Sequence, residues 1–514
     1  MRGRVRQILR SAPAARPRMA PHAHREAWAR RVPMLRATLR GMDESQSVAL
    51  ESQRDLGGLV GLSDLAKVLA DVIDARNRSH VWLALAVLTG RFPDRTTVVE
   101  LARASDFDDG GSLWRTVAEL TTDESAAWTV RVATDEVLVD VAHTASTVLT
   151  TGIQRVARET TRRWLRDHDC TLVSWSRDFQ SLRELTELER ARIVASQAEE
   201  DVEARPEATV VVPWHATYVL PELAAEPARS SRLLALAELT PNRTGVIGFD
   251  CVPLTSAETT QLGFAAVFAS NLAAVRHFDA VATISQAAGT EYAGWRSMLS
   301  AIGATGPRIE PVQLPVEVAE PTPTDVEAAR ARFLVGWLPL VLVVGSHEPR
   351  KNHHAVLHAA ELLWREGVEF SLSFVGGNSW SSDSFSRRLA DLQRVGRHVD
   401  SESRLSDGRL WAAYRLARCT VFPSLNEGFG LPVAESLAVG TPAITSNFGS
   451  MLEIASDGGA LTVDPHDDHA IAAAMRTLLV DNVVHDRLSA EARGRPVRTW
   501  DDYAREVWNL LVVS

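Results

Sequence analysis

The chain has 514 residues, enough for two or more domains that each bury a core. Its 45% hydrophobic and 23% charged residues are typical of a globular protein, and no apolar run reaches the roughly 18 residues of a membrane span. The net charge of −10 disfavours nucleic acid as a partner, and the three cysteines are too few and too scattered for a disulfide framework or zinc site. We therefore expect a cytoplasmic protein, with no signal peptide.

The first 42 residues differ from the rest in charge. They hold eleven arginines and one acidic residue, Glu26, for a net charge of +10. We expect a basic, disordered arm over residues 1–42. It is either a peripheral contact with anionic lipid at the inner face of the membrane or a solvated tail without function.

A helical extension is expected over residues 43–130. The stretch "GLSDLAKVLADVIDARN" offers Ser63 as an N-cap and apolar residues at helical spacing, and "TTVVELARAS" has the same character. We find no chemistry in this segment.

Strands and helices then alternate twice. The first series, residues 131–318, has short apolar strands in "EVLVDVAH", "ATVVVPW", "TGVIGFDCVPL" and "FDAVATIS". The second, residues 319–490, follows a proline-rich linker and has strands in "LVLVVG", "SLSFVGG", "CTVFPS" and "TPAITSN". This alternation predicts an α/β protein with two doubly wound parallel sheets that face a cleft. We expect residues 491–514 to form a helix that packs back on the N-terminal domain.

Two loops of the second series carry candidate site residues. In "SLNEGFGLPVAESLAVGTP", Pro432 suits the first position of a helix, so Glu427 lies in the loop before it and Glu435 one turn inside. Gly428 and Gly430 allow a ligand close to the backbone, and the helix N-terminus favours a phosphate. The carboxylates are good acceptors for paired hydroxyls, such as those of ribose or a hexose.

The other loop, in "LVLVVGSHEPRKNHH", places two cations just before a helix. The strand ends at Gly345, and Arg350 and Lys351 precede a helix expected to start near Asn352. Two cations beside a helix N-terminus form an anion site. The alternative is a surface basic pair, but the chain has only one other lysine, Lys67, against 53 arginines.

The combination of "EPRKN" with "EGFGLPVAE" resembles glycosyltransferase family 4, whose members are retaining enzymes with the GT-B fold. Glu427 and Glu435 match the E-x7-E motif of that family. "TGIQRVARE" and "GFDCVPL" resemble segments of the family's N-terminal domain, so the resemblance covers about residues 135–510.

The resemblance implies four catalytic residues. Arg350 and Lys351 would bind the diphosphate of the donor, Glu427 would hold the transferred sugar, and Asp250 would lie near the reacting sugar. Several family members place a histidine near the reaction centre, where this chain offers Phe249 and Asp250. The group that activates the acceptor is therefore left open.

The resemblance also implies a set of donor-binding residues. Glu435 would accept hydrogen bonds from ribose, glycines would allow close approach to the diphosphate, and backbone groups would hold the sugar. These residues are Gly152, Gly345, Phe429, Gly430, Leu431 and Glu435.

The function expected from this set is transfer of a hexose, mannose or a deoxyhexose, from a nucleotide-diphosphate sugar to a glycan or lipid-linked hydroxyl. The setting would be bacterial surface polysaccharide synthesis. We expect neither a metal nor a cofactor, because the two cations and a helix end would stabilise the leaving diphosphate. The alternative is a non-catalytic GT-B protein that binds a nucleotide sugar.

Overall fold

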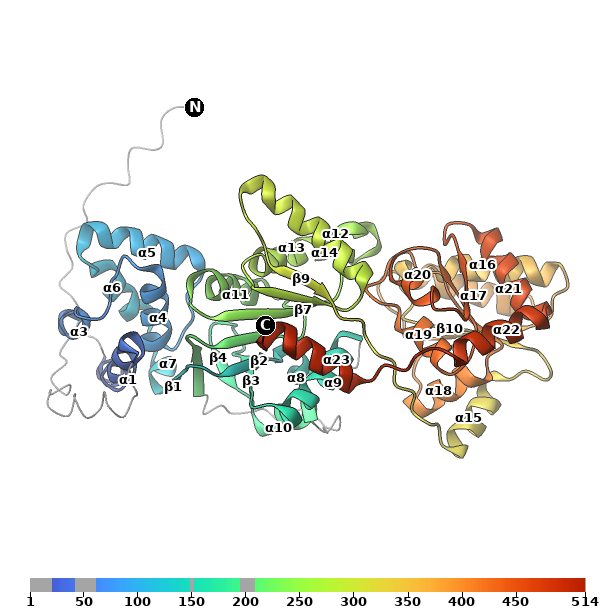
Figure 1. Cartoon of the computed structure of the whole chain (residues 1–514), viewed down its shortest axis with the longest axis horizontal. Coiled ribbons are helices and arrows are strands. Elements are labelled where there is room, and N and C mark those ends of the chain that lie inside the picture. The colour runs from blue at the N-terminus through green and yellow to red at the C-terminus, as the bar shows by residue number, and fades with distance from the viewer. Residues whose placement is uncertain (1–20, 42–61, 148–151, 195–208, 514) are drawn as a thin grey trace, which may run out of the picture.

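The computed structural model describes residues 21–41, 62–147, 152–194 and 209–513 of the chain. Three bodies follow one another along the long axis: a helical extension, a domain around a large sheet, and a second sheet domain (Figure 1). Within the described ranges, no helix is both long enough and apolar enough to span a membrane.

The helical extension is built around helix α4, which is apolar over most of its length. Every residue of α4 from Val81 to Thr89 is buried, as expected of a helix that neighbours surround on all sides. Asn77 caps this helix by accepting from the backbone N–H groups of Ser79 and His80. The helices of the extension are α1 (His22–Arg40), α3 (Leu62–Leu69), α4 (Arg78–Thr89), α5 (Arg95–Asp108), α6 (Gly111–Leu120) and α7 (Asp123–Ala127).

The prediction that residues 1–42 form a disordered arm is wrong for the part that forms helix α1. Residues 22–40 form a regular helix, and Trp28, Val32 and Leu35 on one of its faces lie in the hydrophobic core of the extension. Their spacing of four and three residues marks an apolar helix face, which the many arginines of the segment obscured in the sequence. Residues 1–20 and 42 of the predicted arm lie outside the described residues.

The arginines of α1 also contact protein groups. Arg31 is buried and donates hydrogen bonds to the carbonyl oxygens of Leu88, Ser125 and Trp128, at 2.6 to 2.9 Å. Arg36, also buried, pairs with Asp71. This part of the basic charge therefore holds the extension together.

The N-terminal domain has a nine-stranded sheet in the order β1-β5-β4-β3-β2-β6-β7-β8-β9. It is parallel except for β4, which runs antiparallel to β3 and β5. The sequence predicted a fully parallel sheet, but only six residues separate β3 from β4, too few for a crossover. The strands are β1 (Thr129–Ala133), β2 (Val137–Asp140), β3 (Thr171–Trp175), β4 (Leu182–Glu184), β5 (Thr209–Pro213), β6 (Thr217–Leu220), β7 (Arg243–Gly248), β8 (Ala280–Thr283) and β9 (Arg308–Pro311).

The chain order reverses between β2 and β6, so the N-terminal domain has a switch point where ligands bind in such sheets. The helices of the domain are α8 (Ala142–Ser146), α9 (Gly152–Asp167), α10 (Glu187–Val194), α11 (Pro227–Leu239), α12 (Val252–Thr255), α13 (Phe264–Val275) and α14 (Gln286–Leu299), with 3-10 turns η2 (Ala257–Thr259) and η3 (Ser300–Ile302).

The C-terminal domain has a six-stranded parallel sheet in the order β12-β11-β10-β13-β14-β15. This is the doubly wound order 3-2-1-4-5-6, and its switch point lies between β10 and β13. Its strands are β10 (Leu340–Val344), β11 (Ser371–Val375), β12 (Val399–Glu402), β13 (Cys419–Phe422), β14 (Ala443–Ser446) and β15 (Ala460–Val463). Its helices are α15 (Pro323–Phe333), η4 (Pro349–Lys351), α16 (His353–Arg365), α17 (Asp383–Arg394), α18 (Asp407–Leu416), α19 (Leu431–Ala438), α20 (Gly449–Ala455), α21 (Asp468–Val480) and α22 (Asn482–Arg493).

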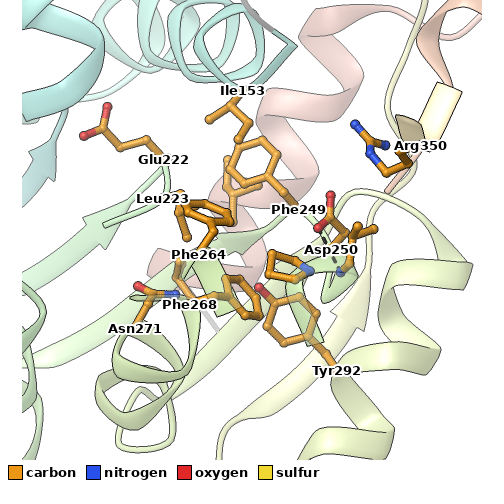
Figure 2. A pocket seen from close by; sticks show the side chains of 14 residues that line it. Ile153, Glu222, Leu223, Phe249, Asp250, Phe264, Phe268, Asn271, Tyr292 and Arg350 are labelled. Carbon is orange, nitrogen blue, oxygen red and sulfur yellow. Dashed lines mark hydrogen bonds between the residues drawn. The ribbon is translucent and has the colours of Figure 1, made fainter. Parts of the chain in front are cut away.

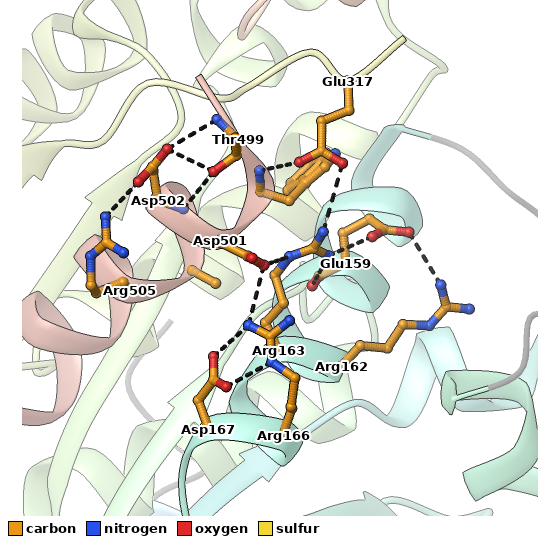
Figure 3. A network of polar contacts seen from close by, with 12 residues as sticks. Glu159, Arg162, Arg163, Arg166, Asp167, Glu317, Thr499, Asp501, Asp502 and Arg505 are labelled. Atoms are coloured by element: carbon orange, nitrogen blue, oxygen red, sulfur yellow. Dashed lines mark hydrogen bonds and ion pairs between the residues drawn. The ribbon is translucent and has the colours of Figure 1, made fainter. Parts of the chain in front are cut away.

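The chain then returns to the N-terminal domain through α23 (Trp500–Trp508) and the π-helical turn η5 (Asn509–Val513). The Trp164 indole on α9 donates to the carbonyl of Ala504 at 2.9 Å, and its ring packs against Trp508. Figure 3 shows a polar network beside this contact, in which Arg163 of α9 donates to Asp501 at 2.6 Å. Helix α9, which begins at Gly152, is therefore anchored by the end of the chain.

Candidate active site

The loops that follow β10 and β13 lie side by side because the two strands are hydrogen-bonded neighbours. The backbone N–H of Leu425 donates to the carbonyl of Arg350 at 2.8 Å, and the Ser424 hydroxyl lies 3.0 Å from the same oxygen. The switch point thus brings together the two segments that the sequence singled out.

Three predicted catalytic residues meet in this place. Lys351 Nζ donates to Glu427 Oε1 at 2.5 Å, Arg350 donates to Glu427 Oε2, and Ser424 adds a hydrogen bond of 2.7 Å to Oε1. Only 9% of the Glu427 side chain and 11% of the Lys351 side chain are exposed. Both cations that were predicted to bind phosphate are therefore paired with the carboxylate that was predicted to hold the sugar.

Burial and charge act against each other in this cluster. Burial opposes ionisation of Glu427, but Lys351 and Arg350 outweigh it and lower the pKa of the carboxyl to about 2. Burial lowers the pKa of Lys351 although Glu427 favours its charged form. An anion that enters the site would bind Arg350 and Lys351, whose side chains Glu427 already holds in place.

Glu435 belongs to a different network. It is buried on α19, where Oε1 accepts from Arg155 at 2.8 Å and Oε2 accepts from the Tyr414 hydroxyl at 2.9 Å. Burial raises the pKa of Glu435, and Arg155 and Tyr414 lower it by less. The two glutamates of the motif thus share none of the partners just named, and Arg155 reaches Glu435 from the other domain.

Backbone conformation at this site requires glycine at two of the predicted positions. Gly345 has φ 148° at the end of β10, and Gly430 has φ 101° as the N-cap of α19. Phe429 before it is buried, and Leu431 begins the helix. A Cβ on Gly152 would lie 3.6 Å from Leu431 Cδ1, so the start of α9 faces the start of α19.

Gly428 has a different role from the one expected. We predicted that it lets a ligand approach the backbone, but a Cβ there would lie 2.5 Å from the carbonyl oxygen of Phe249 in the N-terminal domain. The Ser285 hydroxyl donates to the Gly428 carbonyl at 2.6 Å. Gly428 therefore serves the contact between the two domains.

Asp250 follows β7 and lies beside Arg350 (Figure 2). Oδ1 accepts from the backbone N–H of Val252 at 3.1 Å. Burial raises the pKa of Asp250 to about 6; Arg350 opposes this shift, whereas Glu427 adds to it. A carboxyl with this pKa changes its charge close to neutral pH, as acid–base groups of active sites often do.

Sequence reasoning missed Arg155, Tyr414 and Asn426. Arg155 stands three residues after Gly152, inside the segment that carried the family resemblance. Its place in the first turn of that helix was the one signal that could have marked it as a candidate site residue. Asn426 Nδ2 donates to Thr255 Oγ1 at 3.1 Å across the domains. No local sequence pattern links Tyr414 to Glu435 or Asn426 to Thr255.

The arrangement of the two domains is the GT-B fold. HepE of Anabaena, solved in complex with UDP-glucose, superposes with a TM-score of 0.53 at 13% identity, over 74% of this chain and 100% of that one. Sucrose-phosphate synthase from Thermosynechococcus elongatus gives a TM-score of 0.51 at 17% identity, over 73% and 98% of the two chains. These similarities concern the fold.

A family match covers most of the C-terminal domain. Residues 330–495 match the family described as "Glycosyl transferases group 1". The chain is similar to O-antigen chain mannosyltransferase B of Escherichia coli, 32% identical over 31% of this chain and 42% of the relative. It is also similar to D-inositol 3-phosphate glycosyltransferase of Acidothermus cellulolyticus, 36% identical over 39% of this chain and 47% of the relative. The chain thus spans less than half the length of each of these two relatives.

Proposed function

We propose that the protein is a retaining glycosyltransferase that moves a hexose from a nucleotide-diphosphate sugar to a hydroxyl acceptor. The observation that carries the proposal is the cluster of Arg350, Lys351 and Glu427 at the switch point of the C-terminal sheet. Two cations held by one carboxylate offer preorganised charge for a leaving diphosphate. The family match over residues 330–495 covers this cluster and supports the proposal.

The residues have distinct parts in the proposed reaction. The acceptor oxygen bonds to the anomeric carbon as the bond from that carbon to the diphosphate breaks, and the acceptor proton passes to a phosphate oxygen. Arg350 and Lys351 stabilise the negative charge that develops on the diphosphate, so no metal is required. Glu427 and the backbone of residues 429–431 hold the sugar, and Glu435 binds ribose.

Mannose or a deoxyhexose is the proposed sugar, and bacterial surface polysaccharide synthesis is the proposed setting. The names of two relatives support this choice: O-antigen chain mannosyltransferase B and serotype-specific mannosyltransferase WbdA, both of Escherichia coli. A glycan or a lipid-linked sugar would be the acceptor.

The experiment is a screen of the full chain against nucleotide sugars by thermal shift, followed by turnover assays with the donors that bind. A ligand at 100 times its Kd should add about 2.7 kcal/mol to the free energy of unfolding. Proton NMR of the product then reports whether the anomeric configuration is retained. Tight binding without turnover for any acceptor would favour the non-catalytic alternative.

A further inference from the structure

A cavity of about 170 Å³ lies beside the candidate active site in the N-terminal domain. It lies beyond the carboxyl ends of β6 and β7, close to the switch point between β2 and β6. Figure 2 shows Asp250 and Arg350 at one end of the cavity. The rest of the wall is mostly apolar, with side chains that include Leu223, Val246, Phe249, Phe264 and Phe268.

Tyr292 of α14 places a hydroxyl in this apolar wall. Only 4% of the residue is exposed, and Figure 2 shows the hydroxyl end of its ring turned towards Phe268. Among the residues that the structure describes, none forms a hydrogen bond with this hydroxyl, yet its oxygen keeps accessible surface in the cavity wall. Buried polar groups are nearly always hydrogen-bonded, so this hydroxyl indicates a polar atom of a molecule that occupies the cavity.

The ring of Tyr292 is held in place by the sheet. A Cβ on Gly248, the last residue of β7, would lie 3.0 Å from Cε2 and 3.1 Å from Cζ of the tyrosine, so the ring packs closely on the strand backbone. Burial raises the pKa of Tyr292 well above its ordinary value, and the hydroxyl therefore stays protonated. It can donate one hydrogen bond to an oxygen in the cavity.

Two other polar residues line the cavity, and neither offers it a free acceptor. The Glu222 carboxylate already accepts from the backbone N–H groups of His143 at 2.7 Å and Thr144 at 2.8 Å, and from Arg229 at 2.8 Å. The Asn271 amide oxygen is too deeply buried for a ligand to reach. A ligand hydroxyl that must donate is therefore best placed at the Asp250 end, and a ligand oxygen that accepts is best placed at Tyr292.

Size and polarity restrict what the cavity can hold. An apolar cavity of about 150 Å³ holds a molecule the size of benzene, so this cavity has room for one six-membered ring. A fully hydroxylated hexose would place several hydroxyls against Phe264 and Phe268, where they would lose their hydrogen bonds to water. A six-membered ring with few hydroxyls avoids this cost.

We propose that the cavity binds a sparsely hydroxylated six-membered ring of the acceptor, with an ether oxygen that accepts from Tyr292 and a reacting hydroxyl at Asp250. This inference rests on the proposed glycosyl transfer, because the hydroxyl at Asp250 and Arg350 is the one that would react. It assigns the acceptor to the cyclic ether alcohols, a class that includes deoxygenated sugar rings. Tyr292 becomes a specificity-determining residue.

The test uses tetrahydropyran and cyclohexane as probes, two saturated rings of the same size of which only tetrahydropyran carries a ring oxygen. Ligand-observed NMR measures the Kd of each probe for the full chain, without donor. The two probes differ in their affinity for water, so the quantity compared between variants is the ratio of the two Kd values. Tyr292→Phe should weaken tetrahydropyran relative to cyclohexane about fivefold compared with wild type, the effect of one neutral hydrogen bond.

Tyr503→Phe is the matched control. The Tyr503 hydroxyl lies on α23, is buried without a partner, and is out of reach of a ligand, so its removal should leave the wild-type ratio unchanged. An unchanged ratio in Tyr292→Phe would overturn the inference, as would an equal change in Tyr503→Phe.

A third variant tests the location. Phe268→Trp should fill the cavity and weaken the binding of both probes, whereas inorganic pyrophosphate, expected at Arg350 and Lys351, should bind as in wild type and so report that the variant is folded. Failure of both probes to bind wild type, or undiminished binding to folded Phe268→Trp, would also overturn the inference. Because no donor is present, absence of glycosyl transfer in the turnover assay refutes the proposed function separately.

Discussion

Arg155 of the N-terminal domain donates a hydrogen bond of 2.8 Å to Glu435 of the C-terminal domain. Only 8% of the Glu435 side chain is exposed, and its second oxygen accepts from Tyr414. A ribose that binds Glu435 must therefore share or replace the contact with Arg155. The pair links the relative position of the domains to the ionisation of the carboxyl group that we propose binds ribose.

Replacing Arg155 should make nucleotide binding depend on pH. Burial already raises the pKa of Glu435, and Arg155 opposes that shift, so Arg155→Gln should raise the pKa further. A protonated Glu435 accepts hydrogen bonds from ribose less well. Calorimetry with a nucleoside diphosphate should show affinity about fivefold lower at pH 6 than at pH 8, beyond the change in wild type.

Arg166→Gln is the control for this variant. Arg166 lies on the same helix, is 56% exposed, and pairs with Asp167 and Asp501 away from Glu435. It should show the pH dependence of wild type, which reports titration of the ligand itself. Equal pH dependence in Arg155→Gln and Arg166→Gln would show that Arg155 does not control Glu435.

The two lysines of the chain offer a matched pair. Lys351→Ala should reduce turnover about 100-fold or more, because it removes a preorganised charge from the leaving diphosphate. It should also lower the melting temperature, since Glu427 loses one of two cationic partners in a buried cluster. Lys67, 78% exposed on α3, should tolerate the same change in both assays. Unaltered turnover in Lys351→Ala would remove the main support for the proposed phosphate site.

Much of the fold could be predicted because its signals are local. Short apolar strands that alternate with helices indicated the two doubly wound sheets, and Pro432 at the start of α19 placed its boundary to within one residue. Strand β4, at three residues, was too short for periodicity to show. Helix α1 was missed because its arginines suggested solvent exposure, whereas Arg31 and Arg36 are buried with partners far along the chain.

The candidate site could be predicted within one domain but not between domains. Arg350, Lys351 and Glu427 come from loops after neighbouring strands, and sheet topology brings such loops together. Arg155 and Glu435 are 280 positions apart, and no local pattern pairs them. The same holds for the contact between Gly428 and Phe249, which depends on how the two domains meet.

Glu427→Gln should separate binding of phosphate from binding of sugar. The change keeps the size of the side chain but leaves Lys351 without its carboxylate and Arg350 with Glu348 alone, so the variant should melt at a lower temperature. Inorganic pyrophosphate should raise its melting temperature more than that of wild type, because it supplies the missing negative charge. The nucleotide sugar should bind less well than to wild type. An equal response of both proteins to pyrophosphate would contradict the assignment of Arg350 and Lys351.

Chelation tests the proposed independence from metal. If Arg350 and Lys351 stabilise the leaving diphosphate, EDTA should leave the initial rate of transfer unchanged. The measurement is the rate of release of nucleoside diphosphate before and after dialysis against EDTA. Loss of activity that magnesium or manganese restores would assign this electrostatic role to a bound metal.

The raised pKa of Asp250 should make both activity and stability depend on pH. With a pKa of about 6, the ionised form is lost as pH falls through that value, so kcat/KM should decline about tenfold per pH unit below about pH 6 if the carboxylate takes part. Asp250→Asn should be slower at pH 7 and should lack this acid limb. An identical acid limb in the variant would assign the titration to another group.

As pH rises, the free energy of unfolding should change in the opposite direction to kcat/KM. In the unfolded chain Asp250 titrates near 3.9, so between about pH 4 and pH 6 the folded protein holds the extra proton, and its free energy of unfolding falls as pH rises. Asparagine cannot titrate, so Asp250→Asn should gain stability relative to wild type across this window, by no more than about 3 kcal/mol at pH 7. Denaturant unfolding of both proteins at pH 4.5 and pH 7 measures this difference. A gap that stays constant with pH would mean that the folded environment does not favour the neutral carboxyl.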